Sequence, residues 1–226
     1  MAKINISLEE LVDAGAHFGH QTKRWNPKME EYIYGSEGGV HIFDLTKTKP
    51  MIEEALEFLS KSAKEGKKIL VLGTKKQIKD KVAEYCEEKG IAYVNERWLG
   101  GTISNFEQMK RSIKKMEEMK EGMVSGAYAK HTKKERLLID REIDRLEKFF
   151  GGMKSLNSTP DVLFVIDTKR ENSAVREAKA KKIPVVGIVD TNADPDGIDY
   201  PIPMNDDALR ALDYILKLVV ESISQK

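Results

Sequence analysis

The sequence predicts an α/β protein with a doubly wound parallel sheet and an inserted antiparallel helical hairpin. Residues 67–73, 161–167 and 183–190 are almost continuously apolar, as strands buried on both faces are. Amphipathic segments typical of helices follow them, and this alternation indicates a parallel sheet with helices on both faces. Between residues 103 and 150 the alternation stops, and apolar residues recur every three or four positions instead.

The first part of the body is predicted to begin with a short helix. Ser7 and Glu10 have the spacing of a capping box, which opens a helix. In a later helix, apolar residues at 52, 55, 56 and 59 form one buried face. Gly90 is expected to end the helix that precedes it. In chain order we predict strands at 32–34 and 40–43, a helix at about 48–65, a strand at 67–73, a helix at 75–89 and a strand at 91–94.

The second part of the body continues the same alternation. We predict a strand at 161–167, a helix at about 172–181, a strand at 183–190, an extended segment near 199–203 and a last helix at about 206–222. The body therefore comprises residues 1–103 and 154–226, and the hairpin comprises residues 104–153.

The inserted segment has the pattern of an antiparallel coiled coil. Gly and Ser residues at 122–126 separate its two arms, and Gly151 and Gly152 end the second arm. At ~1.5 Å per residue, each arm would extend about 25–30 Å. Four of the nine methionines lie in the first arm, where they either fill the seam or offer an adaptable surface to a partner. The apolar positions are 103, 106, 109, 113, 116 and 123, then 139, 143, 146 and 150.

The charge of the chain is balanced overall but uneven along the sequence. Of 226 residues, 33% are charged and 40% hydrophobic, a globular composition, and the formal net charge is +1. Residues 61–81 contain eight lysines and two acidic residues, whereas residues 190–213 contain seven acidic residues and one arginine. A chain with this polarity can present one basic face to a polyanion.

The compartment is predicted from three absences in the sequence. A single cysteine, Cys86, excludes an internal disulfide and fits a reducing compartment. The N-terminus lacks the apolar stretch and cleavage site of a signal peptide. No apolar run approaches the ~20 residues that cross a bilayer. We therefore expect a cytoplasmic protein without membrane contact.

The segment 17–28 is the strongest candidate for a nucleic-acid contact. Cations bind phosphates, and planar side chains stack on bases. The alternative is an ordinary solvated loop in which Trp25 packs in the core. The candidate residues are His17, His20, Gln21, Lys23, Arg24, Trp25, Asn26 and Lys28.

Two further candidates follow strands of the predicted sheet, where parallel α/β proteins bind ligands. Residues 73–77 could seat a phosphate at a helix start, with Lys75 and Lys76 beside it. They lack the glycine spacing of a Walker or dinucleotide-binding loop. Residues 95–102 again combine a cation, an indole and paired glycines, although Trp98 could equally pack at the base of the hairpin. The candidates there are Arg97, Trp98, Gly100, Gly101 and Thr102.

Metal binding and catalysis are not predicted. With Gly197 at position six of a calcium loop, Pro203 falls at position twelve, where glutamate is required. His17 and His20 are three residues apart, but His41, His131 and Cys86 do not complete a zinc spacing. No nucleophile, base and acid combination emerges. We expect no metal, no cofactor and no enzymatic activity.

The chain resembles the bacterial small-ribosomal-subunit protein S-two family over essentially its whole length. The resemblance implies a flavodoxin-like, Rossmann-like sheet with an inserted coiled-coil hairpin. Bacterial members often continue into a polar or acidic C-terminal tail, whereas this sequence stops at Lys226. The matching motifs are Ala14–Thr22, Arg24–Met29, Gly73–Lys76, Arg97–Thr102, Leu146–Lys148, Gly151–Gly152, Pro160–Asp167, Ile188–Asn192 and Asn205–Ala208.

The resemblance implies a structural constituent of the small ribosomal subunit that acts in translation. It would bind small-subunit rRNA at the head–body junction on the solvent side, contact neighbouring ribosomal proteins and help dock protein S-one, without a small-molecule substrate. The rival hypothesis is a flavodoxin-like enzyme that binds a nucleotide or phosphosugar at residues 73–77. On the hairpin, the expected RNA contacts are Lys110, Arg111, Lys114, Lys115, Lys130, Lys133 and Lys134.

Overall fold

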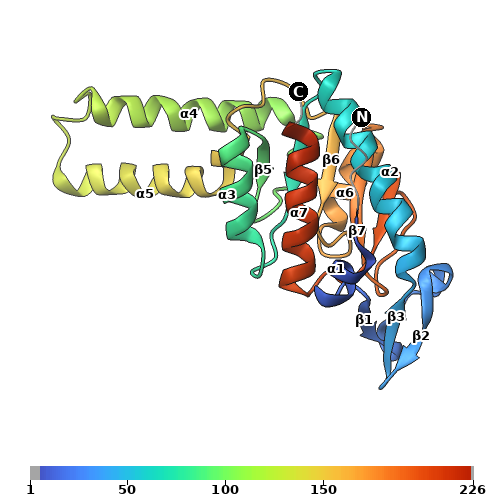
Figure 1. Ribbon diagram of the computed structural model, residues 1–226. Helices are drawn as coiled ribbons and strands as arrows, with labels where there is room; N and C mark the ends of the chain where they lie inside the picture. Colours follow the sequence, from blue (N-terminus) through green and yellow to red (C-terminus); the bar gives the residue numbers. More distant parts are fainter. Residues whose placement is uncertain (1–5, 225–226) are drawn as a thin grey trace.

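A computed structural model describes residues 6–224, which form two β-sheets and seven α-helices (Figure 1). The expectation about a leader segment rests partly on residues 1–5, which lie outside the described residues. Within residues 6–224, no helix combines the length and the apolar character that a membrane span requires.

The larger sheet is parallel throughout and carries the core. Its strands have the order β5-β4-β6-β7-β8, the 2-1-3-4-5 order known from flavodoxin-like sheets. This arrangement confirms the doubly wound α/β prediction. All residues of the four strands β4 to β7 are buried, as their apolar sequences predict. Strand β8 lies at the edge of the sheet and tolerates two prolines, because backbone N–H groups on its open side have no neighbouring strand to bond. The strands are β4 (Ile69–Leu72), β5 (Ala92–Val94), β6 (Val162–Val165), β7 (Val185–Val189) and β8 (Tyr200–Pro203).

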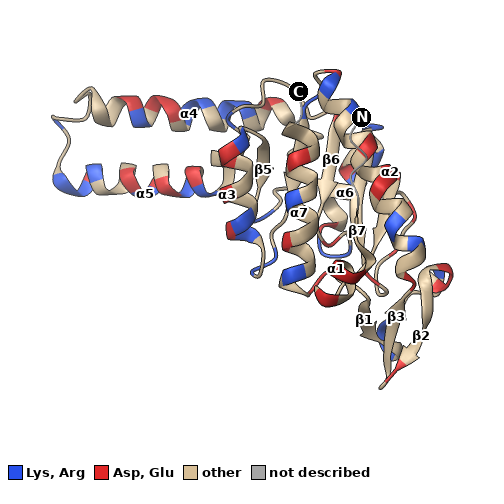
Figure 2. Ribbon diagram, viewed as in Figure 1, with Lys and Arg blue, Asp and Glu red and all other residues tan. Residues whose placement is uncertain are grey.

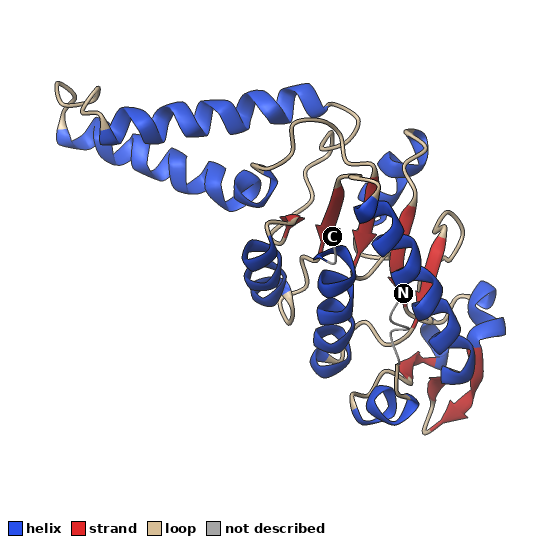
Figure 3. Ribbon diagram, turned by 45° about the horizontal axis from the view of Figure 1, so that its top comes forward, coloured by secondary structure: helices blue, strands red, loops and turns tan. Residues whose placement is uncertain are grey.

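Helices cover both faces of this sheet (Figures 1 and 3). One layer consists of α2 (Leu45–Lys64), α3 (Lys79–Lys89) and α7 (Leu209–Ser224), and α6 (Asn172–Ala180) covers the other face. Gly90 ends α3 in the left-handed region, as predicted. Three helix starts differ from the prediction. Asp44 caps the backbone amide of Thr46, so α2 begins at residue 45, whereas α3 begins only at residue 79, after a turn at 76–78. Helix α7 begins at residue 209 instead of about 206.

A second, three-stranded antiparallel sheet is attached at the carboxyl ends of the parallel strands. Its order is β1-β3-β2, formed by Phe18–Gln21, Val40–Phe43 and Ile33–Glu37. Strand β1 was not predicted from the sequence, because its four residues show no apolar alternation. It pairs with β3 through an interrupted register. Around these strands lie helix α1 (Leu8–Asp13) and the 3-10 helices Thr22–Arg24 and Pro27–Tyr32.

The start of α1 forms only half of the predicted capping box. The Ser7 hydroxyl accepts a hydrogen bond from the backbone amide of Glu10, as expected. The Glu10 carboxylate instead accepts a hydrogen bond from the Tyr214 hydroxyl, over 2.8 Å. This bond ties the first helix to α7.

The inserted segment forms two helices that pack against each other and extend away from the sheet (Figure 1). Helix α4 spans Phe106–Val124, α5 spans Lys133–Phe150, and a 3-10 turn at Gly151–Met153 follows. Their facing side is apolar, and Met116 is fully buried there, which supports methionines as seam residues. Helix α4 continues through the predicted break at 122, so the turn lies at 125–132.

Candidate nucleic-acid interface

The candidate residues from the sequence fall into separate parts of the molecule (Figure 1). The 17–28 segment and the residues after β4 and β5 lie near the carboxyl edge of the parallel sheet. The hairpin cations lie on α4, α5 and the turn between them, with Lys110 and Arg111 in the first turns of α4 and Lys130, Lys133 and Lys134 at the far end of the hairpin. The structure therefore does not gather all predicted contacts into one site.

The 17–28 segment is fixed to the loop that follows β7. The backbone amide of His20 donates to the Thr191 hydroxyl over 2.8 Å, and the amide of Asn26 donates to the Thr191 carbonyl over 2.7 Å. Glycine is required at position 19, since a Cβ there would lie 2.5 Å from Thr191 Cγ2. The segment thus has a defined backbone, and only some of its side chains remain free.

Two rings of the segment, Trp25 and His17, are half-buried, and two of its cations are exposed. The Trp25 ring packs against His41 with ring centroids 5.0 Å apart, and His17 packs on Phe18 at 4.0 Å. Lys23 and Arg24 are exposed, as is Gln21. Within residues 6–224, no carboxylate lies within 4.0 Å of either cation, so both charges can meet a phosphate.

Lys28 is exposed but already paired. Its Nζ atom lies 2.9 Å from Asp194 Oδ2 and 2.5 Å from Asp196 Oδ2. The pair lowers the pKa of Asp194, chiefly through the hydrogen bond from Lys28. The charge of Lys28 is therefore used to neutralise carboxylates in the loop after β7 and is not free to bind RNA phosphate.

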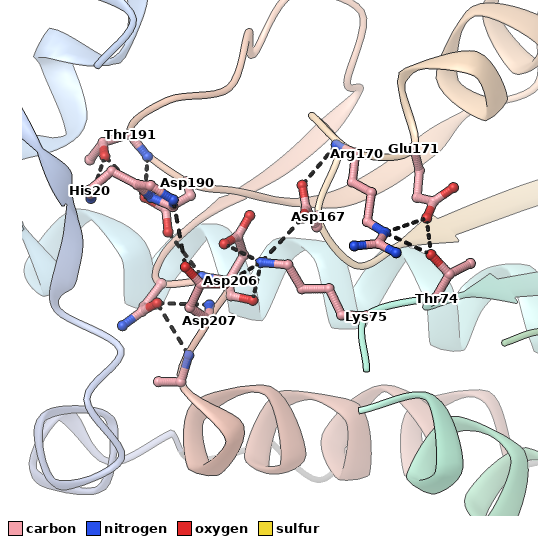
Figure 4. Close-up of polar contacts among 12 residues, drawn as sticks. His20, Thr74, Lys75, Asp167, Arg170, Glu171, Asp190, Thr191, Asp206 and Asp207 are labelled. Atoms are coloured by element: carbon pink, nitrogen blue, oxygen red, sulfur yellow. Dashed lines mark hydrogen bonds and ion pairs between the residues drawn. The ribbon is translucent and has the colours of Figure 1, made fainter. Parts of the chain in front are cut away.

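Lys75 occupies the position where a doubly wound sheet usually receives its ligand (Figure 4). The order of strands reverses beside β4, and the Lys75 side chain follows that strand into a cluster of carboxylates. Its Nζ atom lies 2.6 Å from Asp206, 2.7 Å from Asp207 and 3.1 Å from Asp167. Burial alone would lower the pKa of Lys75, but these carboxylates outweigh burial and raise the pKa above its usual value. Because Lys75 is only 7% exposed, we leave it out of the RNA surface proposed below.

A second polar group fills the neighbouring space at the β4 and β6 ends. The Thr74 hydroxyl donates to the buried Glu171 carboxylate, and Arg170 Nε donates to Thr74 Oγ1 over 3.1 Å (Figure 4). Burial raises the pKa of Glu171 above its usual value. The crevice is thus occupied by the protein's own charged side chains.

His20, from the smaller sheet, contacts the carboxylate cluster around Lys75. Its Nδ1 atom lies 3.0 Å from Asp190 Oδ1, and this hydrogen bond raises the pKa of His20. Burial raises the pKa of Asp206 to about 7, helped by the neighbouring Asp190. One ligating atom each from His20, Asp190 and Asp206 lie within 4.8 Å of one another, a spacing that could hold a metal ion. The sequence reasoning missed this group because it considered only histidine and cysteine as zinc ligands.

A carboxylate of the protein binds the backbone amides at the predicted RNA-contact loop, residues 95–102, and just after it. The Glu177 side chain, from α6, accepts hydrogen bonds from the backbone amides of Gly101, Ile103 and Ser104 over 2.8, 3.1 and 3.1 Å. Burial opposes ionisation of Glu177, but these bonds outweigh it and lower the pKa. No local sequence signal identifies Glu177, which lies more than 70 residues away.

Some of the other candidate residues after β4 and β5 are buried, and some are exposed. Trp98 is buried, with its indole Nε1 3.3 Å from Glu177 Oε1, as the packing alternative predicted. Thr102 is also buried and donates to the Leu99 carbonyl. Arg97 and Gly100 are exposed, as is Lys76 after β4. The accessible candidates of this edge are therefore fewer than the sequence suggested.

The hairpin cations differ in how far they are neutralised. Figure 2 shows both charge signs along α4 and α5, and cations where α5 meets the turn. Lys114 lies 3.6 Å from Glu118, Lys115 lies 3.6 Å from Glu142, and Lys110 donates to the Asn157 carbonyl. In the described part of the chain, no carboxylate lies within 4.0 Å of the exposed cations Arg111, Lys130, Lys133 and Lys134.

Comparisons with known proteins bear on the whole chain. The family model for ribosomal protein S2 matches residues 11–226. The small ribosomal subunit protein uS2 of Koribacter versatilis (strain Ellin345) is 48% identical over 221 residues, covering 98% of this chain and 73% of that protein. The uS2 protein of Geotalea uraniireducens (strain Rf4) is 48% identical over 219 residues, covering 97% of this chain and 86% of that protein.

These matches agree with the geometry of the site. The crevice that an α/β enzyme would use is filled by internal ion pairs, and the free cations lie on the surface instead. The chain belongs to the ribosomal protein S2 family and is a structural, non-enzymatic protein of the small ribosomal subunit that takes part in translation.

Proposed function

We propose that the chain binds small-subunit rRNA through two basic surfaces, at the head–body junction on the solvent side of the subunit. The edge surface consists of Lys23, Arg24, Lys76 and Arg97, and the hairpin surface consists of Arg111, Lys130, Lys133 and Lys134. The observation that carries this proposal is that all eight side chains are exposed and have no carboxylate within 4.0 Å among residues 6–224.

The availability of these charges matters because phosphate contacts release counterions from RNA. A lysine already held by a carboxylate must lose that partner first. Lys120, for example, pairs with Glu147, and both Lys81 and Lys217 pair with Asp213. Apart from Lys110, which donates to the Asn157 carbonyl, the two basic surfaces contain the predicted cations that can bind phosphate without breaking an ion pair.

The enzyme alternative is not favoured by the same geometry. A nucleotide at residues 73–77 would bring its phosphates towards Asp167, Asp206 and Asp207, which surround Lys75. Like charges in a partly buried site repel strongly. Lys75 has no remaining charge to offer such a ligand.

Docking of protein S-one is proposed on a different, apolar surface. Tyr34 is 81% exposed and lines an open cavity of about 360 Å³, and Phe18, next to the lining residue His17, is 47% exposed. Leu8 and Val12 of α1 line the same cavity. Exposed aromatic and aliphatic side chains gathered in one patch are typical of protein-binding sites. The patch supports a protein partner rather than RNA.

The division of the chain follows the same assignment. We propose a flavodoxin-like body of residues 1–103 and 154–226 that carries the edge surface, and a coiled-coil hairpin of residues 104–153 that carries the second. The supporting observations are the 2-1-3-4-5 strand order and the buried seam between α4 and α5.

The test compares charge removal at each surface with charge removal elsewhere. Lys23→Gln with Arg24→Gln, and Lys130→Gln with Lys133→Gln, should each reduce the salt dependence of binding to small-subunit rRNA. Each lost phosphate contact lowers the slope of log K against log salt by about 0.7–0.9. Lys61→Gln with Lys64→Gln, at the far end of α2, is the matched control, because these lysines are also exposed. Equal salt slopes for the wild type, the two surface variants and the control would refute the assignment.

A further inference from the structure

A cavity outside both basic surfaces lies beside the first turns of α6. It measures about 430 Å³ and is lined by residues that follow β6 and β7, including Thr168 and Asn192, and by Asn172 and Arg176 of α6. Asn26, from the 17–28 segment, also lines it. The cavity therefore opens at the same edge of the sheet as the proposed edge surface.

Two polar groups in its wall have no partner. Thr168 is 4% exposed, and its Oγ1 atom is buried without a hydrogen-bond partner within the described residues. The same holds for Oδ1 of Asn192. A buried polar group without a partner costs about 1–3 kcal/mol. Rotation of the Asn192 amide would place its NH₂ donor at the position of that oxygen. These groups indicate a ligand that accepts hydrogen bonds.

The charges around the cavity are predominantly positive. Lys169, Arg176 and Lys179 are exposed, line the cavity and have no carboxylate within 4.0 Å in residues 6–224. The two carboxylates of the cavity wall, Asp194 and Asp196, are both paired with Lys28. The local charge thus remains positive after these pairs are counted.

The start of α6 adds donors of the right kind. The helix has nine residues, and no side chain caps its first turn. The first amides of a helix carry partial positive charge and bind anions. A bound phosphate group needs hydrogen-bond donors and positive charge, and the hydroxyl, the helix start and the three free cations supply both.

We propose that this cavity binds one backbone phosphate of rRNA, as a third contact beyond the two basic surfaces. The assignment rests on the proposed rRNA-binding function, because the 17–28 segment that supplies Lys23 and Arg24 also supplies Asn26 to the cavity wall. The phosphate would accept hydrogen bonds from Thr168 and from the first amides of α6, with Lys169 and Arg176 against its charge.

Two variants of the full chain test the site. Lys169→Gln with Arg176→Gln removes charge from exposed positions, and Thr168→Val removes only the hydroxyl. Binding to in vitro transcribed small-subunit rRNA should weaken several-fold in both, and the salt slope of the first should fall by about one. Thr168→Val should leave the melting temperature of the free protein unchanged or higher, since the unpartnered hydroxyl is lost. Wild-type affinity and slope in both variants would overturn the proposal.

The outcomes separate this site from the proposed function. If the wild-type protein shows no salt-dependent rRNA binding, the proposed function itself fails. If Lys23→Gln with Arg24→Gln weakens binding and the cavity variants do not, only the third contact is wrong. A titration with inorganic phosphate, followed by the amide NMR signals of Asn172 and Arg176, distinguishes the source of the phosphate. Saturation by free phosphate that rRNA does not displace would overturn the RNA assignment.

Discussion

Glu177 offers the sharpest test of how the hairpin is attached to the body. Its carboxylate accepts bonds from Gly101 at one oxygen and from Ile103 and Ser104 at the other. In Glu177→Gln, the amide oxygen can serve only one side, so the NH₂ group faces two N–H donors on the other, either Gly101 and the Trp98 indole or Ile103 and Ser104. Each N–H donor that loses its acceptor lowers the free energy of unfolding by about 1–3 kcal/mol, and the exposed Ser104 amide should be at the low end of this range. We therefore expect a total loss of about 2–4 kcal/mol, which lowers Tm by roughly 5–15 °C in a chain of this length.

The same variant predicts a specific pH dependence. Glu177 titrates near 4.5 in the unfolded chain, and its pKa is lowered in the folded protein. Its ionised form therefore contributes stability above pH 4.5, and this contribution is lost as the pH falls through the folded pKa. The difference in stability between wild type and Glu177→Gln should have its largest value at pH 7 and should decrease below pH 4.5.

Thermal unfolding followed by circular dichroism, at pH 7 and below pH 4, measures both effects. Glu54→Gln, at an exposed glutamate of α2 without an ion pair among residues 6–224, is the matched control and should change Tm little. A Glu177→Gln protein that melts within 1 °C of wild type at pH 7 would refute the role of this carboxylate. A difference that persists at low pH would refute its electrostatic cause.

Three further changes test other parts of the structure. Lys75→Met leaves buried carboxylates without their cation, so urea denaturation at pH 7 should show a loss of about 3–5 kcal/mol; a loss below 1 kcal/mol would contradict the ion-pair cluster. Gly152→Ala places a Cβ 2.4 Å from the Tyr93 carbonyl oxygen and should lower Tm, whereas Gly100→Ala meets no atom within 4 Å and should not. Burial raises the pKa of the Cys86 thiol to about 12, so a thiol reagent should react at pH 8 only as fast as the protein unfolds.

Much of the body follows from local sequence patterns. The apolar runs at residues 67–73, 161–167 and 183–190 became β4, β6 and β7, because strands covered on both faces cannot carry charged residues. Gly90 ended α3 because it has φ of 65° there, which glycine adopts without strain. These features depend on a few neighbouring residues.

The same local reasoning misplaced several site residues. Lys75 follows a strand and precedes a helix, as a phosphate-binding lysine would, but its nearest carboxylates lie about 90 and 130 residues away along the chain. The paired glycines at 100 and 101 suggested free backbone amides, yet the Gly101 amide donates to Glu177. Strand β1 was missed because its pairing with β3, and not its own sequence, makes it a strand.

The sequence by itself determined the order of helices and strands of the parallel sheet, the hairpin seam and the family to which the chain belongs. These depend on apolar periodicity and on ordered motifs, which are local properties of the chain. Only the tertiary structure decided which cations remain free for RNA and which are held by carboxylates. Whether a charge is free depends on distances between residues far apart in sequence, as between Lys28 and Asp194 or Lys75 and Asp206. Folding sets those distances through the packing of whole elements, so no single segment encodes them.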